Sequence, residues 1–147
     1  MANPKGPERI KEMVNMLRTW QGIERQAISE TAEILEQTKS PLVGMIMEII
    51  RHDSLMHHRV QQFLIDSVTK EDVAVTREDV AEIWGKIEAH DKIEKKAIDM
   101  AKQIKDRSWS PVHKQLLSYL LADEEKHDRI LEQLSEFKVG MTRGSGA

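Results

Sequence analysis

Apolar side chains recur along this chain at intervals of three and four residues, the spacing that places them on one face of an α-helix. In the first half of the chain this spacing holds over residues 8–38 and again over 41–68. In the second half it holds over residues 77–107 and 111–138. The pattern therefore predicts four helices.

A serine followed by a proline marks the predicted start of the second and fourth helices. Ser40 precedes Pro41, and Ser110 precedes Pro111. Serine is a favoured N-cap residue, and proline fits the first helical turn. Because only a few residues join the helices there, we expect two antiparallel hairpins and, from them, an all-α, antiparallel four-helix bundle. Residues 69–76 join the hairpins, either as a tight link or as a crossover.

Length and composition indicate one helical domain. With 147 residues the chain is long enough for a single core, so we expect one domain over residues 1–147, with a disordered tail over 140–147. Charged residues make up 32% and hydrophobic residues 39%, and aromatic residues are few. This balance favours helix over sheet.

Charge and apolar run length exclude several classes of partner. The formal net charge of −3 is spread over both signs, and no basic stripe is present to neutralise a run of phosphates, so we expect no nucleic-acid partner. The apolar runs are far shorter than the roughly 20 residues of a membrane span, and the N-terminus has no apolar signal core. We therefore expect no membrane partner and a cytoplasmic location. Without cysteine, any metal must be held by oxygen and nitrogen.

The two halves of the chain are related by a shift of 70 positions, since 94 minus 24 is 70. The shift superimposes Glu24 on Glu94 and His57 on His127 without a gap. Other identical pairs are Ile23 with Ile93, Ala27 with Ala97, Asp53 with Asp123, Arg59 with Arg129 and Leu64 with Leu134. Packing explains the shared apolar residues, but it does not explain the shared acids and histidines. Duplication of a helical hairpin is the simplest interpretation.

Polar residues interrupt all four apolar stripes. They are Glu24 in the first helix, Asp53 and His57 in the second, Glu94 in the third, and Asp123 and His127 in the fourth. Antiparallel hairpins of similar length bring these interruptions to a similar depth, so four carboxylates and two imidazoles should form one buried layer. Buried unpaired charges are costly and clustered carboxylates repel one another. Divalent cations bound in this layer would offset that cost.

The fourth helix offers two acids for one metal position. Asp123 lies four residues before His127, and Glu124 lies three residues before it. Both spacings place the acid and the histidine on one side of a helix. The repeat favours Asp123, because Asp53 is its counterpart.

His90 and two arginines add further alternatives. His90 lies four residues before Glu94, where it is either an extra ligand or a hydrogen-bond partner of a ligand. A layer without metal would instead be a buried network of hydrogen bonds and ion pairs with Arg59 and Arg129.

From about residue 8 to residue 137 the chain resembles the ferritin-like di-iron carboxylate proteins, specifically a rubrerythrin-type domain without the cysteine-containing rubredoxin module. In that family two helices each supply one Glu and the other two each supply a Glu-x-x-His pair. Glu24 and Glu94 match the single positions, and Glu124 with His127 matches one pair.

The other pair departs from the family pattern, because Ser54 lies three residues before His57. Either Asp53 substitutes, as Asp123 would in the second half, or one bridging carboxylate is lost and metal binding is asymmetric. The family spacing favours Glu124 over Asp123.

The resemblance implies two redox-active metal ions, iron first, with manganese or zinc as alternatives. It implies an oxidoreductase of ferroxidase or peroxidase type that acts on Fe(II), dioxygen or peroxide and takes electrons for peroxide reduction from a separate donor protein. A homo-oligomer is compatible with this interpretation. The alternatives are a metal-binding or metal-sensing bundle without turnover and a structural helical adaptor with a degenerate site.

Overall fold

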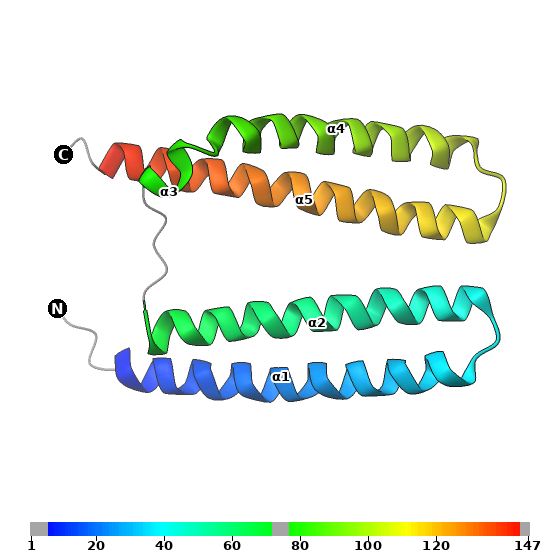
Figure 1. Ribbon diagram of the computed structural model, residues 1–147, viewed down its shortest axis with the longest axis horizontal. Helices are drawn as coiled ribbons and strands as arrows, with labels where there is room; N and C mark the ends of the chain where they lie inside the picture. Colours follow the sequence, from blue (N-terminus) through cyan, green and yellow to red (C-terminus); the bar gives the residue numbers. More distant parts are fainter. Residues whose placement is uncertain (1–5, 72–76, 145–147) are drawn as a thin grey trace. The chain divides into compact units, whose positions relative to one another are not determined.

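The computed structural model describes the backbone of residues 6–71 and 77–144, and their side chains except those of residues 77 and 137–144. Within these ranges the chain is helical and has no strand, which confirms that the fold is all-α (Figure 1). The helices are α1 (Gly6–Gln37), α2 (Pro41–Thr69), α3 (Arg77–Ala81), α4 (Trp84–Arg107) and α5 (Pro111–Gly144). In the described part of the chain, no helix combines the length and the apolar character that crossing a bilayer requires.

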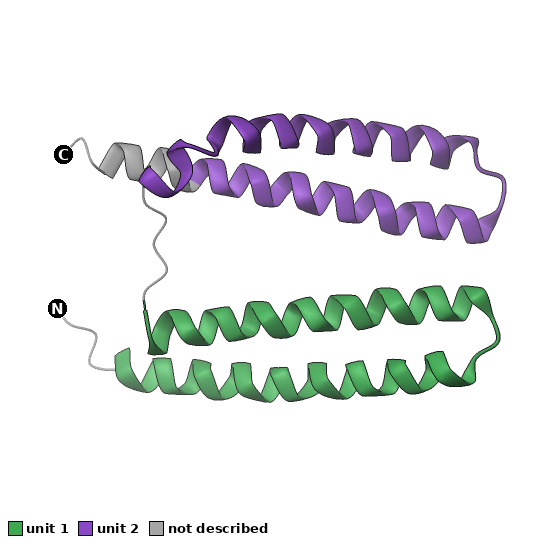
Figure 2. Cartoon of the chain, viewed as in Figure 1, with its two compact units in different colours: residues 1–73 green, residues 74–147 purple. Residues whose placement is uncertain are grey.

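The chain divides into two compact units, residues 1–73 and residues 74–147 (Figure 2). In unit 1, α1 packs along α2, and in unit 2, α4 packs along α5 while the short α3 also contacts α5. Each unit is therefore a helical hairpin, as predicted.

The predicted caps set the start of α2 and of α5. The backbone N–H of Val43 donates to Ser40 Oγ at 3.3 Å, and the N–H of His113 donates to Ser110 Oγ at 3.3 Å. Each serine thus satisfies one of the backbone donors that a helix N-terminus leaves without an intrahelical partner.

The prediction of one helix over residues 77–107 was wrong, because the chain turns between Ala81 and Trp84. The N–H of Ile83 bonds to the carbonyl oxygen of Val80 at 3.2 Å and closes the turn. The turn lets α3 pack on α5, and the side chain of Val80 in α3 is buried. Most of the linker, residues 72–76, lies outside the described residues.

The fourth predicted helix continues beyond residue 138, because α5 runs to Gly144. The expectation of a tail without structure from residue 140 is therefore wrong as far as Gly144, and residues 145–147 lie outside the described part. No described glycine has a positive φ, so Gly140 does not adopt the left-handed conformation that ends many helices.

The seam between α1 and α2 is more polar than the apolar stripe predicted. Its buried side chains are Leu17, Gln21, Glu24 and Thr31 of α1 and Ser54, Gln61 and Ile65 of α2. Successive members are three, four or seven residues apart, the register of two helices that pack along their length. In unit 2 the buried Glu94 and Ala101 of α4 occupy the positions of Glu24 and Thr31 after the 70-residue shift.

Much of the predicted apolar stripe lies beside this seam and is exposed on the hairpin. Trp20 has 52% of its surface exposed, and Ile34 and Ile50 are also exposed. Two helices bury only the edge along which they meet, so an apolar stripe on the neighbouring edge stays uncovered within one hairpin. Each hairpin therefore has a polar seam and an apolar outer face.

Candidate metal centre

In unit 1 the structure brings Glu24 of α1 to His57 of α2. The two atoms Glu24 Oε1 and His57 Nδ1 lie 3.3 Å apart. Glu24 is only 6% exposed, whereas the His57 side chain is 56% exposed, so the pair lies at the edge of the seam. Asp53 is half-buried and Ser54 is buried beside it on α2. The hairpin therefore supplies one carboxylate and one imidazole in contact.

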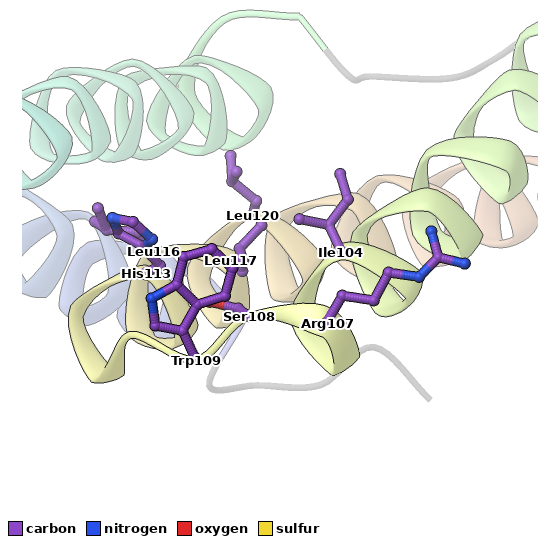
Figure 3. A pocket seen from close by; sticks show the side chains of 8 residues that line it. All are labelled: Ile104, Arg107, Ser108, Trp109, His113, Leu116, Leu117 and Leu120. Carbon is purple, nitrogen blue, oxygen red and sulfur yellow. The ribbon is translucent and has the colours of Figure 1, made fainter.

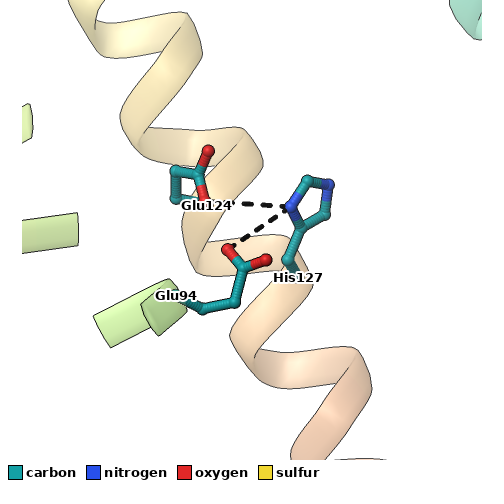
Figure 4. Close-up of side chains that lie close together, drawn as sticks. All are labelled: Glu94, Glu124 and His127. Carbon is teal, nitrogen blue, oxygen red and sulfur yellow. Dashed lines mark ion pairs between the residues drawn. The ribbon is translucent and has the colours of Figure 1, made fainter. Parts of the chain in front are cut away.

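In unit 2 the equivalent pair is joined by a second carboxylate (Figure 4). His127 Nδ1 of α5 lies 3.6 Å from Glu94 Oε2 of α4 and 3.9 Å from Glu124 Oε2 of α5. One donor atom from each of the three residues falls within 4.8 Å of the others. Among the described residues, this is the one group of three such side chains that meets that distance.

The donor distances fit a metal ion. Two donors that are each about 2.1 Å from one ion lie at most about 4.2 Å apart, and both distances to His127 satisfy this limit. Glu94 is 7% exposed, and its Oε2 is buried without a hydrogen-bond partner in the described chain. A buried carboxylate oxygen without a partner is costly. The set of two carboxylates and one imidazole suits iron, manganese or zinc.

Without a metal, the two carboxyl groups of the trio compete for one proton. Hydrogen bonding from Glu124, when it is protonated, holds the pKa of Glu94 below its usual value, with a further contribution from His90. The same interaction with Glu94, together with burial, raises the pKa of Glu124. The two pKa values shift in opposite directions because the carboxyl groups share one hydrogen bond.

A second carboxyl pair, Asp91 and Asp128, lies in the same seam. Hydrogen bonding between them lowers the pKa of Asp91 and raises that of Asp128. Lys95 Nζ lies 3.0 Å from Asp91 Oδ2 and offsets part of the charge. This pair was not predicted from the sequence, although Asp91 precedes Glu94 by three residues and Asp128 follows Glu124 by four. Those spacings are the available signal, because they place each acid one turn from a predicted ligand.

Unit 1 has no carboxylate at the corresponding seam positions. Under the shift, Gln21 replaces Asp91 and His58 replaces Asp128. The Gln21 amide donates to Gln62 Oε1 at 3.0 Å and to the His58 carbonyl oxygen at 3.4 Å. The acidic character of the seam is thus concentrated in unit 2.

The remaining predicted residues lie outside the trio. Asp123 accepts a bond from Lys126 Nζ at 2.8 Å, so its carboxylate already has a cation. Arg59 and Arg129 are exposed, so neither is buried with the carboxylates as the network without metal would require. The geometry thus favours Glu124 over Asp123 as the partner of His127.

A separate hollow of about 470 Å³ lies at the connection between α4 and α5 (Figure 3). Its lining is mainly apolar and includes Ile104, Leu116 and Trp109, and Trp109 is 89% exposed. Ile104 follows Glu94 by ten residues, or about 15 Å along a helix. The hollow is therefore not part of the metal centre.

No protein-family model, curated protein or solved structure matches this chain in the comparisons. The case for a metal centre therefore rests on the residues and their geometry.

Proposed function

We propose that this chain is a non-haem di-metal carboxylate protein, with iron as its metal, that carries out redox chemistry on Fe(II), dioxygen or peroxide. The observation that supports it most strongly is the buried Oε2 of Glu94, which lies 3.6 Å from His127 Nδ1 in the trio that Glu94 forms with Glu124 and His127. In unit 1, Glu24 and His57 correspond to Glu94 and His127 under the 70-residue shift, and they are also in contact. A structural adaptor has no need for buried carboxylates at equivalent places in both hairpins.

The proposal includes closure of the two hairpins into a four-helix bundle. Each hairpin exposes large apolar side chains, among them Trp20 and Ile23 in unit 1 and Ile93 and Met100 in unit 2. Apolar faces of this kind are normally covered in a stable protein. Closure covers them and brings the two carboxylate–histidine pairs to one layer, with one metal ion for each hairpin.

The protein residues in this centre would bind and orient the metals. Glu24 and His57 would hold one ion, and Glu94, Glu124 and His127 would hold the other. Two iron ions supply electron transfer to dioxygen or peroxide. In Fe(II) oxidation the substrate iron provides the electrons and dioxygen accepts them. In peroxide reduction a separate donor protein has to supply them.

A metal titration of the full chain tests the binding part of the proposal. The chain is stripped with a chelator and titrated anaerobically with Fe(II), and in parallel with Co(II), whose absorption bands report nitrogen and oxygen ligands. We expect two ions per chain and loss of binding in a Glu24→Ala, Glu94→Ala double variant. A stripped chain that binds no divalent metal would contradict the proposal.

Turnover separates an enzyme from a metal carrier. The loaded protein is mixed with Fe(II) and dioxygen, or with peroxide and a chemical reductant, and substrate loss is followed. We expect multiple turnovers in one of these assays and none in the double variant. Full loading with both assays inert would leave a metal-binding protein and remove the redox function.

A further inference from the structure

His90 forms a short polar contact with the buried Glu94. Its Nε2 lies 2.8 Å from Glu94 Oε1, one helical turn away on α4. Because a carboxylate oxygen only accepts hydrogen bonds, His90 is the donor. The other oxygen, Oε2, is the one that lies 3.6 Å from His127. His90 thus occupies one oxygen of Glu94 and leaves the other directed toward the trio.

Unit 1 has no equivalent of this contact. The 70-residue shift places Trp20 at the position of His90, and among the described residues no hydrogen bond joins Trp20 to Glu24. Glu24 instead uses its Oε1 for the contact with His57 itself, at 3.3 Å. The two halves therefore differ in how their central glutamate is held.

The two units also differ at the residue three positions before the histidine, on α5 in unit 2 and on α2 in unit 1. Unit 2 has Glu124 within the trio, whereas unit 1 has the buried Ser54 at that position. A serine hydroxyl is a much weaker ligand for a divalent ion than a carboxylate. Unit 2 thus combines three strong donors with a residue that orients one of them, and unit 1 offers two donors in contact and the half-buried Asp53 nearby.

We propose that His90 is a positioning residue that holds Glu94 for metal binding, and that the metal position of unit 2 consequently fills before that of unit 1. This inference rests on the proposed metal centre. A group that hydrogen-bonds to a metal ligand fixes the orientation of that ligand, and its loss typically lowers metal affinity about 10- to 100-fold. The first ion should therefore bind more tightly than the second.

Calorimetric and Co(II) titrations of the stripped full chain test this inference. We expect a Glu24→Gln variant to bind one ion with the affinity of the first wild-type ion. A His90→Ala variant should bind its first ion about 10-fold or more weakly. His90→Gln, whose amide can still donate to Glu94, should recover part of that affinity. His113→Ala, an exposed histidine elsewhere on α5, serves as the matched control and should bind as the wild type does.

The outcomes separate this inference from the function on which it rests. If the wild-type chain binds no metal, the proposed function fails. If it binds metal while His90→Ala retains full affinity, the positioning role is overturned and the metal centre stands. If Glu24→Gln weakens the first ion as much as Glu94→Gln does, the order of filling is overturned. A lower melting temperature of metal-free His90→Ala with unchanged affinity per folded chain would also overturn the positioning role.

Discussion

The carboxylate of Glu94 is the clearest sign of a ligand-binding role at the scale of single residues. It is nearly buried in the seam between α4 and α5, one oxygen accepts from His90, and the other has no hydrogen-bond partner in the described chain. A buried polar group without a partner costs about 1–3 kcal/mol. A metal ion or a shared proton offsets this cost, and the ion and the proton compete for the same carboxylate oxygens.

A Glu124→Gln substitution should maintain or raise the stability of the metal-free protein and reduce the stabilisation that a bound metal provides. The metal-free variant should melt at the same temperature as the wild type or higher, because an amide removes the like charge beside Glu94. It should lose most of the stabilisation by metal, which for a site with the ion at 100 times its Kd is about 2.7 kcal/mol. Thermal melts with and without Fe(II) or Co(II) measure both effects. Glu125→Gln, the neighbouring acid on α5, is the control, and equal behaviour of the two variants would contradict the account.

The stability of the metal-free protein should depend on pH through the same pair. The raised pKa of Glu124 means that its contribution is present at low pH and is lost as pH rises through that pKa. The lowered pKa of Glu94 means that its contribution is lost as pH falls through that pKa. Stability from the pair is therefore greatest between the two values, where one proton is shared.

Melting curves of the metal-free protein between about pH 4 and pH 7 check this expectation. We expect the difference in melting temperature between wild type and Glu124→Gln to shift in favour of the variant as pH approaches 7. A difference that stays constant over this range would show that the two carboxyl groups do not share a proton.

Part of the candidate site could be predicted from the sequence. The spacing and the repeat predicted that Glu24 would lie near His57 and Glu94 near His127, and the structure has both contacts. The choice between Asp123 and Glu124 could not be made from the sequence. Adjacent residues differ by about 100° around a helix, so this choice depends on which edge of α5 meets α4.

At the scale of elements, the two helical hairpins could be predicted from local features of the sequence. The residues that are buried between the helices of each hairpin could not. The serine caps and short connections predicted where α2 and α5 begin. The apolar stripe predicted a helical face but not which edge of it the hairpin partner would cover. In unit 1 the partner covers mainly polar residues such as Gln21 and Gln61. The break before Trp84 was also not predictable, because it depends on α3 packing against α5.

The capping serines give a prediction at this scale. Ser40→Ala removes the acceptor for the Val43 N–H and should cost about 1 kcal/mol in the free energy of unfolding. Urea denaturation measures it. Ser29→Ala, in the exposed interior of α1, should be neutral or slightly stabilising because alanine is the better helix former. A neutral Ser40→Ala would contradict the role of this cap in starting α2.

At the scale of the whole molecule, each hairpin needs a partner surface. Polar side chains form much of the unit 1 seam, while large apolar residues such as Trp20, Ile23 and Phe63 are exposed on that hairpin. A hairpin with that distribution buries too little apolar surface to offset the entropy of folding alone. The proposed four-helix bundle would supply such a surface to each hairpin.

Two tryptophans test closure of the bundle. Trp20 lies on the apolar face that closure would cover, and Trp109 lies at the exposed connection between α4 and α5. We expect Trp20→Ala to cost about 3 kcal/mol in the free energy of unfolding, as for a core aromatic residue. Trp109→Ala should cost less than about 0.5 kcal/mol. Equal small effects in urea denaturation would show that the face around Trp20 stays uncovered.

Anomalous diffraction from crystals of the iron-loaded full chain tests the central claim most directly. The account predicts two iron peaks per site, about 3.5–4 Å apart as in other two-metal centres. Glu24 and His57 should coordinate one peak, and Glu94, Glu124 and His127 the other. Absence of iron from these residues in a crystal that holds iron elsewhere would contradict the account.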